Sequence, residues 1–104
     1  MNKTDLEQVT NKLYRLTLLF PKKEPLRYKM REVANDILAD FVVWEVFYTS
    51  NPGRFEQTNQ GEKRDLVFAI EKNLEILNSY FEIAKWQNWV SYFDILDIQG
   101  EYDK

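Results

Sequence analysis

The sequence predicts an all-α protein, an antiparallel up-down-up-down four-helix bundle with three long helices and a short fourth helix. Apolar residues recur every three or four positions along most of the chain, which is the period of an amphipathic helix. The 104 residues include only three glycines and three prolines, so long uninterrupted helices are possible. Hydrophobic residues make up 44% and charged residues 30%, a balance typical of a single globular domain, here spanning residues 1–104.

The first helix is expected from about Asp5 to Phe20. Thr4 and Glu7 have the spacing of a capping box, which places the N-cap at Thr4. Pro21 ends the helix, because the residue before a proline is disfavoured in the helical conformation. The apolar stripe of this helix consists of Leu6, Val9, Leu13, Leu16 and Phe20.

The second helix is expected to begin at Pro25, where a proline sacrifices no hydrogen bond, and to run to about Thr49. Residues 41–48 have the composition of a strand. We reject that alternative because no helix breaker precedes them and the helical period continues through them. The apolar stripe of this helix consists of Leu26, Met30, Val33, Ile37, Phe41, Trp44 and Tyr48.

A polar segment over residues 50–61 is expected to form a mobile loop, since it opens with Ser-Asn-Pro-Gly. The third helix is expected to begin near Glu62, and its periodicity weakens near Trp86. A short fourth helix is expected to start around Asn88 or Ser91. Its predicted apolar face consists of Trp89, Phe93 and Leu96.

Positive charge is concentrated between Lys12 and Arg31. This stretch carries +6 while the whole chain carries −3, so the remainder carries −9. A small acidic protein with one basic pole has a preferred face for anionic partners such as RNA phosphates. The alternative is a solvated face whose cations pair with acids of the third and fourth helices. The cations that we expect to gather at one end of the bundle are Lys12, Arg15, Lys22, Lys23, Arg27 and Arg31.

Residues 41–48 are apolar around the whole circumference of the expected helix, whereas an amphipathic helix buries one stripe. A monomeric bundle of this size has little room to surround such a segment. We therefore interpret it as a subunit interface, with an unusually buried core helix as the alternative. Phe68, Trp86 and Trp89 add aromatic side chains beyond a single stripe. The expected interface residues are Phe41, Val43, Trp44, Phe47 and Tyr48.

The absence of histidine and cysteine excludes disulfides, thiol nucleophiles, histidine-based catalytic triads and the usual zinc sites. Carboxylates remain, because Asp36 and Asp40 are four residues apart, as are Glu71 and Glu75. Facing pairs of this kind can hold magnesium in all-helical nucleotide hydrolases, which we keep as an alternative function. Because this spacing is common on solvated helices, we expect no enzymatic activity, no cofactor and no metal site.

A first helix that ends in Phe20-Pro21-Lys22, followed by a long helix that is basic and then apolar, resembles a family of small four-helix bundles. That family includes proteins encoded by intervening sequences in large-subunit ribosomal RNA genes and the accessory variability determinants of diversity-generating retroelements. The resemblance implies a non-catalytic accessory protein that assembles into a ring, typically a pentamer. It also implies binding to RNA and to a reverse transcriptase through basic surfaces.

These observations together predict a homo-oligomeric adaptor whose basic end engages RNA or a reverse transcriptase, and a protein-interaction module without a nucleic-acid role is a further alternative. We expect no small-molecule substrate and no membrane partner, because the longest strictly apolar run, residues 41–44, is far too short to span a bilayer. The polar N-terminus does not resemble a signal peptide, and we expect a cytoplasmic location. The chain stops at Lys104 within a helical pattern, which leaves truncation after this residue open.

Overall fold

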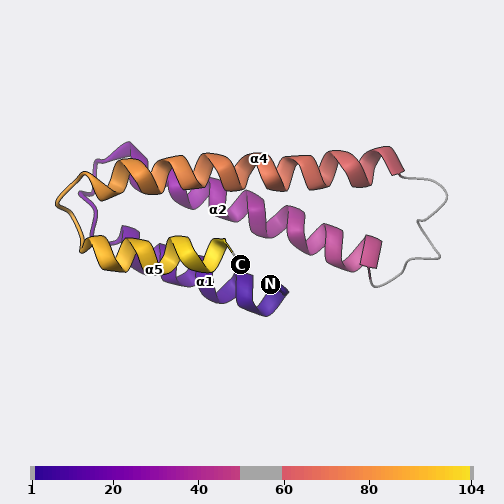
Figure 1. Ribbon diagram of the computed structural model, residues 1–104, viewed down its shortest axis with the longest axis horizontal. Helices are drawn as coiled ribbons and strands as arrows, with labels where there is room; N and C mark the ends of the chain where they lie inside the picture. Colours follow the sequence, from indigo (N-terminus) through magenta and orange to yellow (C-terminus); the bar gives the residue numbers. More distant parts are fainter. Residues whose placement is uncertain (1, 50–59, 104) are drawn as a thin grey trace.

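The computed structural model describes residues 2–49 and 60–103, and these residues form helices and short connections with no strand (Figure 1). The helices are α1 (Lys3–Thr17), α2 (Pro25–Trp44), the π-helical turn η1 (Glu45–Thr49), α4 (Gln60–Lys85) and α5 (Tyr92–Tyr102). The predicted all-α class with four α-helices is therefore confirmed for the described part of the chain. Residues 50–59 of the expected loop lie outside the described residues, and Gln60 and Gly61 already belong to α4.

The N-terminus of α1 is capped by Asn2, so the predicted N-cap at Thr4 is wrong. Asn2 Oδ1 accepts a hydrogen bond from the Asp5 N–H at 2.8 Å, and the Asn2 N–H donates to Asp5 Oδ2 at 3.5 Å. This is a reciprocal cap of the expected kind, shifted toward the N-terminus by two residues. Asparagine is the stronger N-cap of the two residues, which accounts for the shift.

The end of α1 also differs from the prediction, because the helix stops at Thr17 and not at Phe20. The N–H groups of Leu19 and Phe20 each donate to the carbonyl three residues earlier, at 3.1 Å, so the chain tightens as it leaves the helix. Phe20 then turns inward and is only 2% exposed. Its ring centroid lies 4.9 Å from that of Trp89, so the α1–α2 connection packs against the α4–α5 connection.

The predicted start of α2 is confirmed, with Pro25 as the first helical residue and Glu24 as its N-cap. The segment with strand-like composition is α-helical to Trp44 and π-helical from there to Thr49, so the strand alternative is excluded. The later of the two predicted starts of the fourth helix is also confirmed. Ser91 Oγ accepts a hydrogen bond from the Phe93 N–H at 3.2 Å and caps α5.

The predicted apolar face of the fourth helix is wrong. Phe93 is 73% exposed and Leu96 is 37% exposed, and Trp89 precedes the helix. The buried side is the neighbouring stripe of Ile95, Ile98, Gln99 and Tyr102, which packs toward α1 and α4. The sequence of α5 carries two competing apolar stripes, and the positions of α1 and α4 decide which one is buried.

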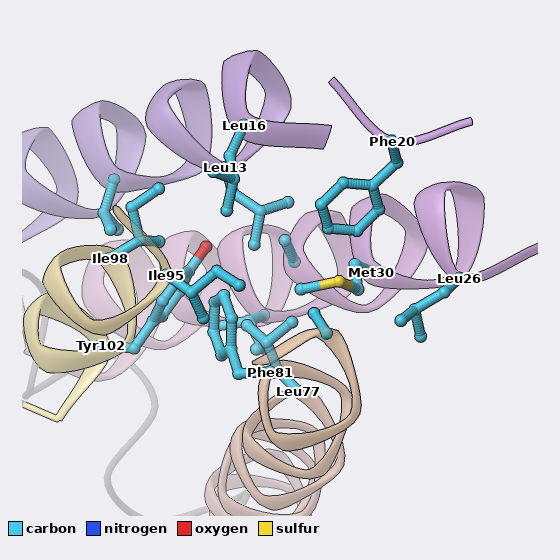
Figure 2. Packing of buried hydrophobic residues seen from close by; sticks show 14 of the residues in the cluster. Leu13, Leu16, Phe20, Leu26, Met30, Leu77, Phe81, Ile95, Ile98 and Tyr102 are labelled. Atoms are coloured by element: carbon cyan, nitrogen blue, oxygen red, sulfur yellow. The ribbon is translucent and has the colours of Figure 1, made fainter. Parts of the chain in front are cut away.

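One hydrophobic core is built by residues from all four α-helices, and Figure 2 shows their side chains converging between the helices. The predicted stripe of α1 is buried in full, which confirms the helical period of that segment. The buried hydrophobic residues are Leu6, Val9, Leu13, Leu16, Phe20, Leu26, Met30, Ala34, Ile37, Leu77, Phe81, Ala84, Ile95, Ile98 and Tyr102.

This core occupies only part of the length of the molecule. α4 has 26 residues, or about 39 Å, whereas α1 has 15 and α5 has 11, or about 22 and 16 Å. We call the part with four helices the base (residues 2–37 and 77–103) and the part beyond it the arm (residues 38–49 and 60–76). The arm consists of α4 with the end of α2 and η1, and none of its described side chains is fully buried.

Candidate functional site

Arg31 is bound to the end of α1 and does not project freely into solvent. Its Nε donates to Thr17 Oγ1 at 2.7 Å, and its Nη2 donates to the Tyr14 carbonyl at 3.3 Å. The guanidinium also lies 5.0 Å from the centroid of the Tyr14 ring. The Tyr14 carbonyl also accepts hydrogen bonds from the Leu18 N–H and the Thr17 hydroxyl, so Arg31 adds a charged donor at the C-terminus of α1 and fastens it to α2.

Arg27 and Lys12 also have contacts within the molecule. Arg27 is only 9% exposed, and its guanidinium lies 5.8 Å from the centroid of the Tyr28 ring. Lys12 Nζ lies 2.6 Å from Glu101 Oε1 and so connects α1 to α5. An exposed ion pair of this kind adds little stability, but it neutralises the Lys12 charge locally. Three of the six predicted binding cations are thus engaged in intramolecular contacts.

Arg15, Lys22 and Lys23 are the exposed cations of the predicted set, and we call them the basic end. None of the three makes an ion pair within 4 Å in the described part of the chain. The two lysines lie in the connection between α1 and α2, which is held in place by a hydrogen bond from the Tyr28 hydroxyl to the Lys22 carbonyl at 2.8 Å. The structure therefore brings exposed positive charge to one end of the base.

A groove of about 590 Å³ between α1 and α5 limits the positive potential around Arg15. Three carboxylates of α5 line this groove opposite the two cations of α1, so opposite charges face each other across it. The two lysines of the α1–α2 connection do not line the groove, and they are the better candidates for binding an anion. The lining residues are Lys12, Arg15, Leu16, Leu19, Asp94, Asp97, Ile98 and Glu101.

Exposed aromatic side chains lie at the same end of the molecule as the lysines, because the α4–α5 connection also turns there (Figure 1). Trp86 is 85% exposed and Phe93 is 73% exposed. Tyr92 packs edge-on against Phe93, and Lys85 Nζ lies 5.6 Å from the Tyr92 ring centroid. The sequence marked Trp86 as a surplus aromatic, but the exposure of Tyr92 and Phe93 depends on which stripe of α5 is buried.

The predicted interface residues lie in the arm and are half-buried or exposed. Phe41 and Trp44 are half-buried, with ring centroids 5.9 Å apart, whereas Val43 and Phe47 are 40% and 42% exposed. The side chain of Tyr48 lies outside the described residues. The structure adds two exposed residues to the set: Val46 at 41%, which the prediction missed, and Phe68 at 66%, which it counted only as a surplus aromatic.

The four carboxylates of the alternative hydrolase site are divided between two places. Glu71 and Glu75 line a groove of about 430 Å³ between α4 and the end of α5, and neither Asp36 nor Asp40 lines it. Burial and the nearby Asp36 carboxylate raise the pKa of Asp40, and Lys72 opposes this shift. Within residues 2–49 and 60–103, no group of three or more acidic side chains is placed to hold a metal ion.

A hydrogen-bond network joins α5 to α4 beside that groove. The buried Gln99 donates from Nε2 to Asn78 Oδ1 at 2.5 Å and to Glu82 Oε2 at 3.0 Å. Lys85 Nζ also donates a hydrogen bond to Glu82 Oε2. The hydrogen bonds from Lys85 and Gln99 to this carboxylate lower the pKa of Glu82. Gln99 and Asn78 are thus structural residues, which satisfy each other where α5 meets α4.

Comparisons with protein-family models, with curated proteins and with solved structures found no match. The resemblance to the ribosomal intervening-sequence and retroelement accessory family therefore stays a prediction. None of the helices in the described part of the chain combines the length and the apolar character that a membrane crossing requires.

Proposed function

We propose that the protein is a non-catalytic, homo-oligomeric adaptor, an antiparallel up-down-up-down bundle whose basic end engages RNA or a reverse transcriptase. The observation that carries this proposal is the position of two exposed surfaces of different chemistry. The apolar arm lies at one end of the molecule and the basic end at the other (Figure 1). A molecule with two such surfaces is suited to joining copies of itself through one of them and a second partner through the other.

The arm supports self-association. Val43, Phe47 and Phe68 are each at least 40% exposed, and Phe41 and Leu74 of the arm are only half-buried. Exposed apolar side chains gathered in one part of a small protein typically mark a protein interface. The family resemblance implies a ring of about five subunits for this assembly.

The basic end supports an anionic partner. Lys22 and Lys23 are exposed at the end of the molecule where the connection that contains Trp86 also turns, and cations with aromatic rings are typical of surfaces that bind single-stranded nucleic acid. Leu18 and Leu19, at 60% and 64% exposed, lie at the same end and favour the alternative of a protein partner with an acidic, partly apolar surface. RNA binding is the first prediction to test because it requires only the isolated protein.

The test is the salt dependence of RNA retention by the wild-type protein and two single variants. Each phosphate that a cation neutralises on a single strand makes the slope of log binding constant against log salt concentration more negative by about 0.7. Lys22→Gln should therefore make that slope less negative by about the same amount. Lys3→Gln removes the same charge from the opposite end of α1 and should leave the slope unchanged. If the wild-type protein retains no RNA even at about 20 mM salt, where the Debye length is roughly 20 Å, direct RNA binding is wrong and the protein-partner alternative replaces it.

The non-catalytic part of the proposal has its own test. The purified protein should not hydrolyse nucleoside triphosphates when magnesium is added. Turnover that disappears in both Asp40→Ala and Glu71→Ala would replace the proposal with the hydrolase alternative.

A further inference from the structure

Arg27 is a buried cation without a counter-ion. The residue is only 9% exposed, and its Nε is buried without a hydrogen-bond partner. None of the ion pairs within residues 2–49 and 60–103 includes it. Because an arginine stays protonated under all conditions in which a protein is folded, the charge cannot be removed by loss of a proton. Buried charges in proteins are normally paired, so Arg27 lacks a partner that its position calls for.

Arg31, one turn further along α2, shows what Arg27 is missing. Two of the Arg31 nitrogens donate hydrogen bonds to oxygens at the end of α1. The contact that the described residues give Arg27 is with the Tyr28 ring, whose centroid lies 5.8 Å from the guanidinium. A ring face attracts a cation, but it carries no net charge and does not replace the oxygens that a guanidinium binds. The donors of Arg27 are therefore available to a ligand.

The neighbouring acid does not neutralise Arg27. Glu24 is the only acidic residue between Lys12 and Arg31. Its carboxylate caps α2 by accepting a hydrogen bond from the Leu26 N–H at 3.2 Å, and it lies more than 4 Å from the Arg27 nitrogens. The end of α2 thus has a carboxylate that is already used and a guanidinium that is not.

The elements at the same end of the base add no acid to this place. The α4–α5 connection has no charged residue from Trp86 to Tyr92, and α1 has no acid from Lys12 to its end. The first acids of α5, Asp94 and Asp97, line the groove opposite Arg15, and that groove does not include Arg27. The positive charge at the start of α2 is therefore left for a partner outside the described chain.

Two further cations are tied to the same place. The Tyr28 hydroxyl donates a hydrogen bond to the Lys22 carbonyl at 2.8 Å, while the Tyr28 ring lies against the Arg27 guanidinium. One side chain thus connects the buried arginine to the α1–α2 connection, where Lys22 and Lys23 are exposed.

We propose that Arg27, Lys22 and Lys23 form an oxyanion site that takes a phosphate group. A phosphate group carries about −1.5 to −2 charges at pH 7 and offers three acceptor oxygens. The planar guanidinium can donate parallel hydrogen bonds to two of these oxygens, and the lysines supply further positive charge from the surface. The inference goes beyond the proposed function, because a phosphorylated small molecule and an RNA strand offer the same chemistry.

The direct test is the Nε–Hε resonance of Arg27 in ¹⁵N-labelled wild-type protein, assigned by its loss in Arg27→Gln. Titration with inorganic phosphate at constant ionic strength should shift this resonance until the site is saturated, because the phosphate oxygens accept hydrogen bonds from the guanidinium. The Arg31 resonance should shift less, since its Nε–H is already bonded to Thr17. An Arg27 resonance that phosphate leaves unchanged would overturn the proposal.

The variants separate a site from a general effect of charge. Arg27→Gln should weaken phosphate binding roughly tenfold or more in calorimetry, since it removes charged hydrogen bonds. Arg27→Lys keeps the charge but loses the fork of donors, and it should recover only part of the affinity. Lys29→Gln is the matched control, because it removes one exposed cation from the opposite side of α2. It should change the affinity less than about threefold, since solvent and salt screen its charge. Equal losses in Arg27→Gln and Lys29→Gln would contradict a site at Arg27.

Stability distinguishes a binding role of Arg27 from a structural one. In chloride buffer Arg27→Gln should melt at the same temperature as the wild type or higher, because it removes an uncompensated buried charge. Phosphate should raise the melting temperature of the wild type more than that of the variant, since a ligand of the folded state stabilises it. The general salting-out effect of phosphate is common to both proteins. A variant that melts lower in chloride and responds to phosphate as the wild type does would show that Arg27 is only structural.

A short single-stranded RNA distinguishes the source of the phosphate group. If Arg27→Gln retains less RNA than Lys29→Gln does, the site holds a phosphate of RNA and supports the proposed function as well. If RNA retention is equal in the two variants while inorganic phosphate binding is lost only in Arg27→Gln, the site takes a free phosphate group. A wild-type protein that retains no RNA would overturn the proposed RNA partner, whereas the phosphate titration decides the oxyanion site by itself.

Discussion

The helices α2 and α4 run through both the base and the arm, yet only the base has a core. In the base, α2 and α4 contribute residues such as Met30 and Phe81, which are 0% and 1% exposed. In the arm, the same helices carry equally apolar residues such as Ile70 and Phe41 that stay half-buried. The difference lies in the number of neighbouring helices, because apolar composition contributes stability only where other elements remove it from water.

The largest expected effect is a difference in stability between two leucine-to-alanine variants of α4, one in the base and one in the arm. Leu77→Ala in the base should lower the free energy of unfolding by about 2–5 kcal/mol, because Leu77 is 1% exposed and its removal leaves a cavity. Leu66→Ala in the arm should cost less than half as much, because Leu66 is only half-buried. Urea unfolding of the two variants measures both. Equal losses would contradict the division into base and arm.

The loss of stability at alkaline pH measures how strongly Tyr102 is buried in the base. Burial raises the pKa of Tyr102 to about 12, with smaller and opposing effects of the Thr10 hydroxyl and the Glu101 charge. The unfolded value is about 10, so the folded state disfavours the phenolate. The stability that depends on protonated Tyr102 is therefore complete below about pH 10 and is lost as the pH rises toward 12, by up to about 3 kcal/mol.

Tyr102→Phe should abolish the part of the stability loss at alkaline pH that comes from ionisation of Tyr102. The hydroxyl has no hydrogen-bond partner among the described residues, so the variant should cost little at neutral pH. Unfolding measured from pH 8 to pH 12 in both proteins gives the comparison. Identical alkaline curves would show that Tyr102 is more hydrated than the structure indicates.

Two arginines of the basic segment should behave differently within the base. Arg31→Gln should cost about 1.5–3 kcal/mol, because it removes charged hydrogen bonds to Thr17 and to the Tyr14 carbonyl. Arg15→Gln removes the same charge from an exposed side chain and should change stability by less than about 0.5 kcal/mol. Thermal unfolding resolves the two, and similar effects would mean that Arg31 does not fasten α1.

The smallest expected effect concerns Asp40 in the arm. Partial burial raises its pKa above 3.8, so the folded state favours the protonated form and the contribution of Asp40 to stability falls as the pH rises through that pKa. Asp40→Asn should therefore stabilise the protein slightly at pH 7, by a few tenths of a kcal/mol because solvent screens the group, and should be neutral below about pH 3. Urea unfolding at the two pH values measures the difference, and a loss of stability at pH 7 would contradict this prediction.

The helices could be predicted from the sequence because each has a local signal. The stripe from Leu6 to Leu16 has one period and one possible face, and Pro25 marks a helix start by its own chemistry. The buried face of α5 could not be predicted, because Phe93 and Leu96 compete with Ile95 and Ile98 at the same spacing. That choice depends on tertiary packing, which periodicity does not contain.

The candidate surfaces could be predicted only in part, for the same reason. The all-round apolar segment of the second helix indicated surplus apolar surface, and the structure places that surface in the arm. The basic segment indicated six binding cations, but Arg27 is buried and Arg31 is hydrogen-bonded to α1. Whether a cation is exposed depends on neighbours such as Thr17 and Tyr14, and a charge count gives no information about them.

The positions of Asn2 and Asp103 have a practical consequence for anyone who handles this protein. α1 begins after Asn2 and α5 ends before Asp103 at the level where the base gives way to the arm (Figure 1). A purification tag or fluorescent protein fused at either terminus would therefore stand beside the arm and crowd the apolar surface through which we propose self-association. A label introduced at Lys23, at the far end of the base, would report on assembly without obstructing it.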